Sequence, residues 1–316
     1  MKYVIGIDIG GTTVKMGLFQ EDGILIEKSA HHTDREGGPR AVFENITVHL
    51  ADLFVRNRIS LEECIGVGVG VPGPVMDETF TSVVVNLGWE NVDVGKELNR
   101  KFGLPVKVAN DANIAALGEM WQGAGAKYDS LVLITLGTGI GGGVVYKGEI
   151  VSGAHGVGGE IGHMPILEQP EERTCGCGKN YCIELVASAT GIKERAAKRL
   201  RDLDIPSALR NYNNTFDARA VFKLAEKGDE IAKQIVYETG FYLGKGCAII
   251  SSIINPEVFV IGGGVSNAGE TLLEPIRTNY QKFCFGPAID TPIIKAMLGN
   301  DAGIYGAARL MLTGGE

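Results

Sequence analysis

The sequence lacks the features of a membrane-spanning or nucleic-acid-binding protein. No apolar run reaches the length of about 18 residues that a transmembrane helix requires. Lysine and arginine form no extended cluster, and the formal net charge of −8 argues against broad contacts with a phosphate backbone. The opening residues, MKYVIGIDIGG, are arranged as an apolar strand that runs into a glycine turn and not as a signal peptide. We therefore expect a cytoplasmic protein that binds neither membranes nor nucleic acids.

Cysteine is also scarce, with six residues in the chain. Since a cytoplasmic location keeps thiols reduced, we interpret Cys64, Cys247 and Cys284, which stand in apolar contexts, as small core residues. Glycine, in contrast, is abundant, with 45 of 316 residues. The glycines stand in short clusters between apolar runs, which predicts tight turns where the backbone closely approaches another group.

A repeated pattern predicts an α/β protein with two similarly built lobes. Residues 5–19 and 133–146 both contain an apolar strand, a Gly/Thr turn and a returning strand, with no room for a helix in the first copy. No linker rich in proline, serine and glycine separates the lobes. We place a small lobe at 1–118 and a large lobe at 119–301, and expect the C-terminal helix, at about 302–316, to pack back on the small lobe. Apolar spacing predicts further helices at 41–58, 187–201, 217–227, 229–253 and 270–282.

The first Gly/Thr turn has the composition of a phosphate-binding loop. Its glycines let backbone N–H groups form a concave nest for phosphate oxygens, and Asp8 is suited to hold Mg²⁺ directly or through water. The alternative is a tight hairpin turn that Asp8 caps. The turn is neither a Walker loop nor a dinucleotide fingerprint, because no Gly-Lys-Ser/Thr ending is present and a strand follows it. The candidate nucleotide-binding residues here are Asp8, Gly10, Gly11, Thr12, Thr13 and Lys15.

Two later turns carry the same kind of sequence. One is formed by Gly137, Thr138 and Gly139 in the second copy of the pattern. The other follows a strand, leads towards a helix and suits close approach of a flat adenosine; it is formed by Gly262, Gly263 and Gly264. Either turn alone is compatible with a connection that has no functional role. Three such turns in this order favour a nucleotide site.

Asp111 is the candidate general base. It follows an apolar strand, 106–109, and stands at the start of a helix, where open α/β sheets bind their ligands. A carboxylate within hydrogen-bond reach can take the proton of a sugar hydroxyl, and the rest of phosphoryl transfer is positioning and charge stabilisation. The alternative is that Asp111 or Asn110 serves as the N-cap of the helix.

One histidine and three cysteines are close together in the sequence. His163, Cys175, Cys177 and Cys182 satisfy a tetrahedral zinc ion with no open position, which is typical of a structural site. The Cys-x-Cys spacing is too tight for a comfortable disulfide. The alternative is a redox or unligated cluster. A zinc ion here would hold the neighbouring Glu160 and Glu184 as acceptors for sugar hydroxyls.

With these segments the chain resembles the ROK family of bacterial sugar kinases and sugar-responsive repressors. The matching segments are IGIDIGGTT (5–13), GVGVPGPV (68–75), VNLGW (85–89), NDAN (110–113), LGTGIGGG (136–143), GEIGH (159–163) and CGCGKNYCIE (175–184). The resemblance implies the actin-like, ribonuclease-H-like ATPase fold, with ATP and sugar in a cleft between the lobes. It implies a homodimer or homotetramer, and Asp111 as the general base. The sugar contacts that it implies, in addition to Asp111, are Gly73, Asn86, Asn110, Glu160, His163 and Glu184.

Within the family, residues 86–94 and 110–127 are most similar to the glucokinases of Gram-positive bacteria. This similarity implies ATP-dependent phosphorylation of glucose to glucose 6-phosphate. Kinases for N-acetylmannosamine, fructose and allose reuse the same residues and are the alternatives. The sequence departs from the family at Tyr181, where a glycine is usual, so we expect zinc to bind but the local turn before Glu184 to differ.

Two alternatives come from other functional classes. ROK repressors carry a winged helix-turn-helix before the first strand, whereas here that strand starts at residue 3. An actin-like ATPase or filament protein needs neither the sugar carboxylates nor the zinc segment. The sequence therefore favours the kinase over both.

Overall fold

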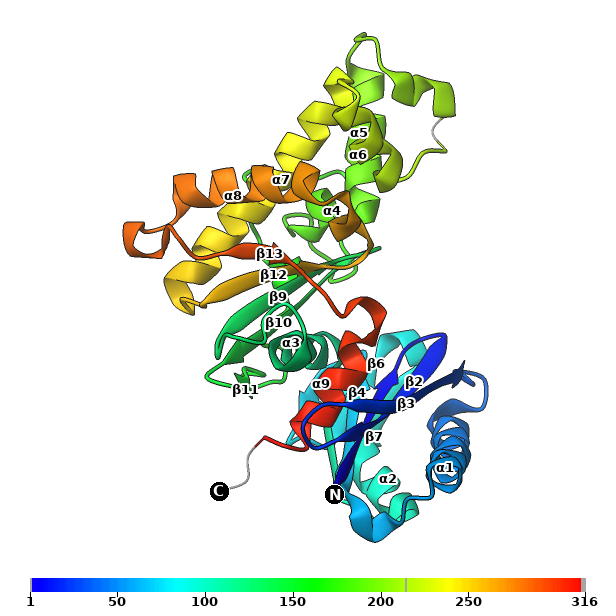
Figure 1. Ribbon diagram of the computed structural model, residues 1–316. Coiled ribbons are helices and arrows are strands. Elements are labelled where there is room, and N and C mark those ends of the chain that lie inside the picture. The colour runs from blue at the N-terminus through cyan, green and yellow to red at the C-terminus, as the bar shows by residue number, and fades with distance from the viewer. Residues whose placement is uncertain (1, 214, 314–316) are drawn as a thin grey trace. The chain divides into compact units, whose positions relative to one another are not determined.

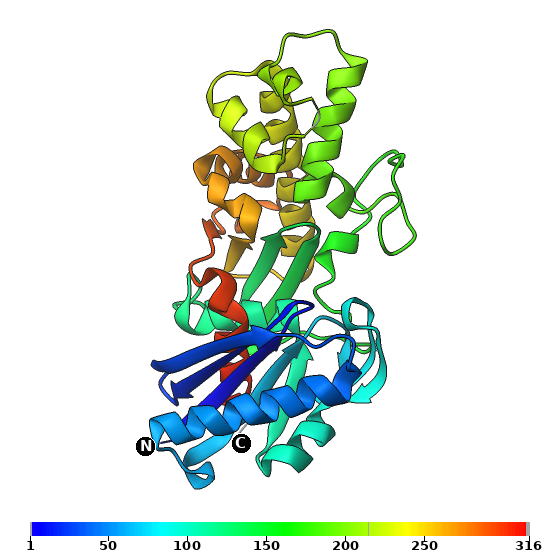
Figure 2. The same cartoon turned by 90° about the vertical axis from the view of Figure 1, so that its right-hand side faces the viewer.

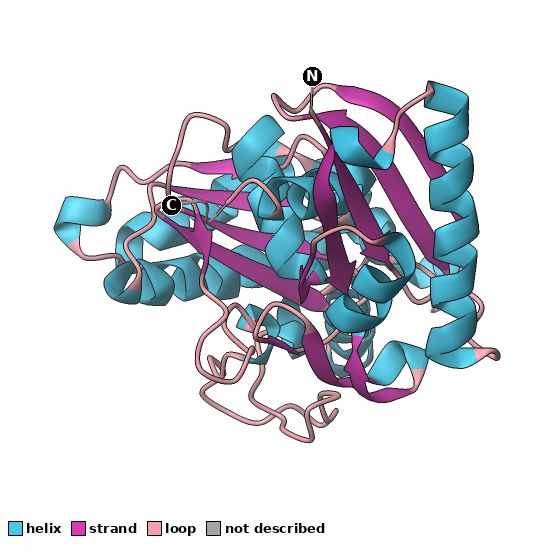
Figure 3. Cartoon of the chain, turned by 90° about the horizontal axis from the view of Figure 1, so that it is seen from below, coloured by secondary structure: helices cyan, strands magenta, loops and turns pink. Residues whose placement is uncertain are grey.

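The computed structural model describes residues 2–213 and 215–313, and the chain is an α/β protein (Figures 1 and 3). These residues fold into two compact units. Unit 1 comprises Met1–Asp129, Gly143–Gly159 and Leu298–Glu316, and unit 2 comprises Ser130–Gly142 and Glu160–Met297. Each unit is built around strands with helices packed on them, as the colouring by secondary structure in Figure 3 shows.

A five-stranded sheet with the order β3-β2-β1-β4-β8 forms the centre of unit 1. β1 pairs antiparallel with β2 and parallel with β4, which confirms the predicted hairpin; β2 pairs antiparallel with β3, and β4 parallel with β8. A three-stranded antiparallel sheet, β5-β6-β7, lies beyond β4 in the sequence. The strands are β1 Tyr3–Ile9, β2 Thr13–Gln20, β3 Leu25–His32, β4 Cys64–Val71, β5 Val75–Met76, β6 Phe80–Val84, β7 Trp89–Asp93 and β8 Val106–Asn110.

Helix α1 (Gly38–Asn57) lies across one face of this sheet, as the blue helix in Figure 2 shows. Its buried residues follow helical spacing, for example Val42, Ile46, Leu50 and Leu53, which confirms the prediction of a helix here. They join the apolar strand residues in one continuous core. The helix ends where Arg58 adopts a left-handed conformation, with a φ of 56°. Helix α2 (Val94–Phe102) begins at an aspartate cap and belongs to the same core.

Helices α3 (Asp111–Gln122) and α9 (Ala302–Leu310) pack against each other, and α9 also packs on β1 and β4. Glycines make these contacts very close. A Cβ on Gly6 would lie 1.9 Å from the carbonyl oxygen of Ile304, and a Cβ on Gly306 would lie 1.5 Å from the carbonyl oxygen of Ile114. Any larger residue would push the helix away, so glycine is required at both points.

The second sheet repeats the strand order of the first. Its order is β11-β10-β9-β12-β13, with β12 parallel to both β9 and β13. Numbered by appearance, both sheets have the order 3-2-1-4-5. Both begin with the strand–turn–strand pattern that is repeated in the sequence, although the sequence did not predict the full order. The division between the units falls within β10. The strands are β9 Leu131–Leu136, β10 Ile140–Tyr146, β11 Glu149–Ile150, β12 Val258–Gly262 and β13 Ile293–Lys295.

The remaining helices belong to unit 2. The longest, α7, begins where the side chain of Asp229 accepts a hydrogen bond from the Ala232 N–H, and packs against α8. The helices are α4 Glu184–Ala187, α5 Ala189–Asp202, α6 Ala218–Glu226, α7 Glu230–Ile253 and α8 Glu270–Phe283. Short 3₁₀ helices occur in both units. Those of unit 1 are η1 Leu61–Glu63, η2 Val85–Leu87 and η7 Gly299–Asp301, and those of unit 2 are η3 Ile161–His163, η4 Ala208–Tyr212, η5 Gly264–Ala268 and η6 Gly286–Ala288.

Composition predicted three cysteines in the core and no membrane-spanning helix. Cys64 and Cys247 are buried as predicted, but Cys284 is partly exposed, because it stands at the end of α8 and not on its packed face. Among the described residues, no helix combines the length and the apolar character that crossing a membrane requires.

Candidate active site

The first glycine turn is held by hydrogen bonds within unit 1. The Gly10 N–H donates to the Thr13 carbonyl oxygen at 3.0 Å, which closes the turn between β1 and β2. The buried Thr33 ties it from the side: its N–H donates to the Thr12 carbonyl oxygen at 3.0 Å, and its hydroxyl donates to the Gly10 carbonyl oxygen at 2.8 Å. The turn therefore has a fixed shape, as a preformed phosphate nest requires.

Asp8 is the penultimate residue of β1, and its side chain is largely buried. Burial raises the pKa of its carboxyl, and Lys15, whose Nζ lies 3.8 Å from Asp8 Oδ2, opposes this effect. The Lys15 ammonium also donates to the carbonyl oxygen of Asn300 at 2.7 Å. A Cβ on Gly303 would lie 2.6 Å from Asp8 Oδ2, so the N-terminal end of α9 closely approaches the carboxylate. A desolvated carboxylate gains from a cation, and this donor fits Mg²⁺.

Asp111 is the first residue of α3, directly after β8. Asn110 is the cap of this helix, since its Oδ1 accepts from the N–H groups of Ala112 and Asn113 at 2.9 and 3.2 Å. Asp111 Oδ1 also accepts from the Ala112 N–H, at 2.8 Å. Asn110 therefore fulfils the alternative interpretation as a helix cap, and the helix does not depend on Asp111 for it.

The other unit 1 candidates lie near these groups. The Asn110 side chain donates to the carbonyl oxygen of Gly73 at 3.3 Å. A Cβ on Gly11 would lie 3.7 Å from Asn86 Cβ, so Asn86 of η2 is beside the first glycine turn. β1, β4 and β8 are parallel neighbours, and Asp8, Gly73, Asn110 and Asp111 stand at or just beyond their carboxyl ends. This is the sheet edge at which open α/β sheets bind ligands.

The second glycine turn is held by hydrogen bonds within unit 2. The Gly137 N–H donates to the Gly139 carbonyl oxygen at 2.9 Å. The N–H of Ala189 donates to the Gly137 carbonyl oxygen at 2.8 Å, and the hydroxyl of Thr190 donates to the Thr138 carbonyl oxygen at 2.8 Å. The carbonyl oxygens of Gly137, Thr138 and Gly139 therefore all accept hydrogen bonds from other groups of the chain.

The third turn contains a position that only glycine fits. Gly263 has a φ of +78°, and a Cβ on it would lie 2.5 Å from both the N and the carbonyl O of Leu136. Its own carbonyl accepts hydrogen bonds from the N–H and hydroxyl of Ser266, at 3.1 and 2.7 Å. The chain then enters η5, followed by α8.

Part of the second turn (Gly137 and Thr138) and the last residue of the third (Gly264) line one cavity of about 430 Å³ in unit 2, because β9 and β12 are parallel neighbours. Gly139, Gly262 and Gly263 do not line it. Helix α6 with its cap Asp217, the first residue of α5 and residues of η5 form most of the rest of its wall. Among the lining residues are Gly137, Thr138, Ala189, Asp217, Arg219, Phe222, Lys223, Glu226, Gly264 and Val265. The wall combines apolar groups with a few polar ones, as ligand pockets do. The α6 residues were not predicted, since an amphipathic helix has no motif that marks it as a pocket wall.

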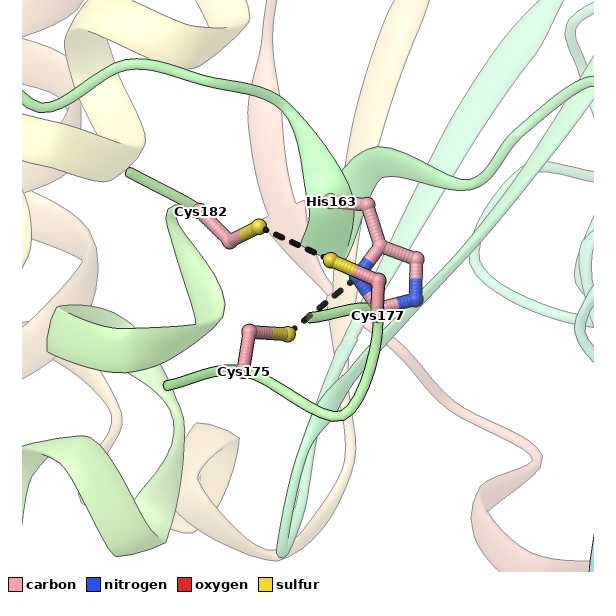
Figure 4. Close-up of side chains that lie close together, drawn as sticks. All are labelled: His163, Cys175, Cys177 and Cys182. Atoms are coloured by element: carbon pink, nitrogen blue, oxygen red, sulfur yellow. Dashed lines mark hydrogen bonds between the residues drawn. The ribbon is translucent and has the colours of Figure 1, made fainter. Parts of the chain in front are cut away.

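The predicted metal ligands come together in unit 2 (Figure 4). The ligand atoms of His163, Cys175, Cys177 and Cys182 all lie within 4.8 Å of one another. Cys175 Sγ is 3.4 Å from His163 Nδ1, and Cys177 Sγ is 3.4 Å from Cys182 Sγ. A disulfide is excluded, because its S–S bond measures about 2.05 Å. Ligands of a tetrahedral zinc ion stand at such separations, given Zn–S bonds of about 2.3 Å.

The electrostatics of the cluster also fit zinc. Burial, followed by contacts with the neighbouring thiols, raises the pKa of Cys182 to about 12. Burial likewise raises the pKa of Cys175. Thiolates crowded in this way are unfavourable without a cation, and zinc stabilises them by coordination.

Tyr181 does not disturb the metal site. The residue is not among the described residues with a positive φ, so the position needs no glycine in this chain. Its carbonyl oxygen accepts from the N–H groups of Ile166 and Leu167 at 3.1 and 3.3 Å, and Cys182 forms a β-bridge with Pro165. These contacts hold Cys182 in the ligand cluster.

Three predicted sugar contacts surround the metal site. With Nδ1 directed at Cys175, His163 places Nε2 3.8 Å from Glu160 Oε2. Glu184 Oε2 accepts from the Ile140 N–H at 2.9 Å, and its Oε1 lies 3.4 Å from Cys175 Sγ. The structure thus brings Glu160, His163 and Glu184 together in unit 2, whereas Gly73, Asn86, Asn110 and Asp111 belong to unit 1.

A repeated five-stranded sheet with glycine turns at its strand ends defines the class of actin-like ATPases, and comparison with known proteins agrees. The chain belongs to the ROK family, which it matches over residues 4–313. It is 39% identical over 315 residues to the glucokinase of Halalkalibacterium halodurans, covering 98% of this chain and 95% of that protein. The glucokinase of Thermotoga maritima is 36% identical, with 98% and 96% covered. The crystal structure of a ROK family glucokinase from Streptomyces griseus in complex with glucose and AMPPNP has a TM-score of 0.75 at 30% identity, with 99% and 100% covered. The predicted fold is confirmed.

Proposed function

We propose that this chain is an ATP-dependent hexose kinase that converts glucose to glucose 6-phosphate. The proposal is carried by the full-length similarity to glucokinases. The cavity that joins the second and third glycine turns and the cluster of carboxylates around the metal site support it.

In the proposed reaction, Asp111 is the general base. Its carboxylate takes the proton of the hexose hydroxyl as the hydroxyl oxygen bonds to the γ-phosphorus of ATP. The bond between that phosphorus and the β–γ bridging oxygen breaks, and ADP leaves with the electron pair. Asp111 then returns its proton to solvent. Asn110, which caps α3, holds the start of this helix in place.

The proposed nucleotide contacts are the three glycine turns. Adenosine would occupy the cavity of unit 2, beside Gly264 and α6. Backbone N–H groups of the first two turns would contact phosphate oxygens, together with the hydroxyls of Thr12 and Thr13. Bound Mg²⁺ neutralises charge on the phosphates, and Asp8 would hold it directly or through water. Lys15 lies beside that carboxylate.

The proposed sugar contacts are carboxylates, amides and one imidazole, which suit a neutral, hydroxyl-rich ligand. The residues are Gly73, Asn86, Asn110, Glu160, His163 and Glu184. Zinc would be structural: held by His163 and three cysteines, it would order the chain from 163 to 184. From the family resemblance we also propose that the enzyme is cytoplasmic and forms a homodimer or homotetramer. Sedimentation velocity measures the oligomeric state.

A substrate panel tests the function. Glucose, fructose, allose, mannose and N-acetylhexosamines are compared with Mg-ATP and ranked by kcat/KM. We expect glucose to rank first. A higher rank for N-acetylmannosamine, fructose or allose would keep the kinase but replace the substrate. ATP turnover that continues undiminished without any sugar would overturn the proposal in favour of an actin-like ATPase.

A further inference from the structure

The residues that follow the last zinc ligand are tightly packed. After Cys182 the chain passes through α4, and Ile183, Leu185, Val186 and Ala187 are all at most 2% exposed. The Ser188 side chain is fully buried, and its hydroxyl caps α5 by accepting from the Gly191 N–H at 3.0 Å. This stretch therefore has little freedom to move independently of the metal ligands.

The same stretch makes three hydrogen bonds to the second glycine turn. The acceptor Glu184 Oε2 is 2.9 Å from the Ile140 N–H, the Ala189 N–H is 2.8 Å from the Gly137 oxygen, and the Thr190 hydroxyl is 2.8 Å from the Thr138 oxygen. The three bonds reach Gly137, Thr138 and Ile140, which directly follows the turn, so the turn is held from its first residue to its end. Gly137, Thr138 and Ala189 also line the cavity of unit 2.

Glu184 connects this turn with the metal site. A Cβ on Gly139 would lie 2.3 Å from Glu184 Oε2, so the carboxylate packs directly on the turn. Its other oxygen, Oε1, lies 3.4 Å from Cys175 Sγ. One carboxylate therefore contacts a zinc ligand with one oxygen and the glycine turn with the other.

We propose that Glu184 and Thr190 are positioning residues for the nucleotide, and that zinc binding strengthens ATP binding through them. The inference rests on the proposed function and extends it. From the sequence, zinc was expected to hold Glu160 and Glu184 as sugar contacts, with no role in nucleotide binding. Backbone N–H groups bind phosphate well when their turn is already ordered. Without zinc the 163–184 segment is less ordered, and the second glycine turn loses its hydrogen-bond partners. Part of the binding free energy of ATP is then used to order this turn.

The hydroxyl of Thr190 gives the cleanest test, since it is not among the proposed sugar contacts. Thr190→Val removes a donor to the turn and keeps the shape. Thr215→Val is the control, because its hydroxyl also donates to a backbone carbonyl oxygen, that of Tyr212, in an exposed part of unit 2 away from the second glycine turn. Calorimetry measures binding of a non-hydrolysable ATP analogue with Mg²⁺ in the absence of sugar, and mass spectrometry measures zinc.

We expect Thr190→Val to bind the analogue about three- to tenfold more weakly, in line with the loss of one hydrogen bond. Its KM for ATP should rise with an unchanged KM for glucose and one zinc per chain, while Thr215→Val stays within twofold of wild type. Analogue binding by Thr190→Val within twofold of wild type would overturn the inference. Failure of wild type to bind the analogue would instead overturn the proposed function.

Zinc is tested separately by hydrogen exchange. In Cys177→Ser, and in wild type stripped of zinc, we expect the Ile140 amide to exchange faster and the analogue to bind at least about tenfold more weakly. Folded, zinc-free protein with wild-type analogue affinity would contradict the proposal.

If Cys177→Ser does not fold, the Glu184→Gln variant provides the test. It should keep zinc but bind the analogue about three- to tenfold more weakly, and unchanged affinity would again contradict the proposal.

Discussion

Asp111→Ala separates the role of a general base from that of a helix cap. The substitution removes the carboxylate at the first position of α3 and leaves Asn110 in its capping position. If Asp111 is the base, the rate falls while the fold persists. If it were mainly a cap, stability would fall while the remaining folded protein stayed active.

The structure sets the size of both effects. Asp111 Oδ1 accepts from the Ala112 N–H, but Asn110 Oδ1 accepts from the same group, so this N–H keeps a partner in the variant. The loss then includes the attraction between a carboxylate and a helix N-terminus, about 0.3–1 kcal/mol, and leaves the Asn110 cap in place. General base catalysis contributes about 10²–10⁴ in rate, which corresponds to about 3–5 kcal/mol of transition-state stabilisation. The two effects differ enough to be distinguished.

The assay compares kcat for glucose with unfolding in urea. We expect Asp111→Ala to lose at least about 10² in kcat, and to keep its affinity for a non-hydrolysable ATP analogue. Asp93→Ala is the matched control, since Asp93 caps α2 by accepting from the Lys96 N–H at 3.0 Å. The control should lose about 0.5–2 kcal/mol of stability and retain its kcat. An Asp111→Ala variant with more than a tenth of the wild-type kcat would refute the assignment.

Three further predictions concern other parts of the chain. Cys177→Ser should lose zinc, measured by mass spectrometry, and much of the glucose affinity; stoichiometric zinc would show that the ligand set is wrong. Gly263→Ala should weaken binding of the ATP analogue, because a Cβ would lie 2.5 Å from the backbone of Leu136 at a φ of +78°; unchanged binding and stability would contradict the close contact. Burial and, to a lesser degree, His49 lower the pKa of His31 to about 4, so the folded state excludes a proton that the unfolded chain binds. The contribution of the neutral His31 ring to the free energy of unfolding is complete above the unfolded pKa of about 6.5 and declines as the pH falls towards 4. After allowance for the partly exposed ring, wild type should lose about 1 kcal/mol more than His31→Leu between pH 7 and 5 in urea unfolding; equal losses would refute it.

The parts of the fold that follow local periodicity were predictable from the sequence. The β1–β2 hairpin, α1 and the repeated strand–turn–strand pattern of β1–β2 and β9–β10 follow from apolar spacing and the positions of glycine turns. The full strand order of the two sheets was not predicted. The three-stranded sheet β5-β6-β7 was not predicted. Its strands have two to five residues, too few for an alternating pattern, and Asp77 and Glu78 form their first turn with positive φ, which non-glycine residues rarely adopt.

The site was predictable where neighbouring residues in the sequence share a task. The glycine turns and the ligands of the metal cluster are of this kind. The partners that tertiary packing supplies were not predictable. The hydrogen bond from the Ile140 N–H to Glu184 joins residues 44 positions apart, and the α6 residues Arg219, Phe222 and Lys223 line the cavity although no motif marks them. Which helix faces which turn depends on the packing of the whole unit.

The abundance of glycine has a second cause that the sequence did not reveal. We expected glycines at turns, yet Gly6 in β1 and Gly306 in α9 stand inside regular elements and have no positive φ. They are required because a Cβ at either position would strike the backbone of the neighbouring element. The elements held in this way carry the two carboxylates proposed for the reaction: Asp8 is the penultimate residue of β1 and α3 begins at Asp111, and α9 packs against both elements. Close backbone contact thus fixes the carboxylate proposed for Mg²⁺ relative to the proposed base, although neither glycine is among the proposed contacts with nucleotide or sugar.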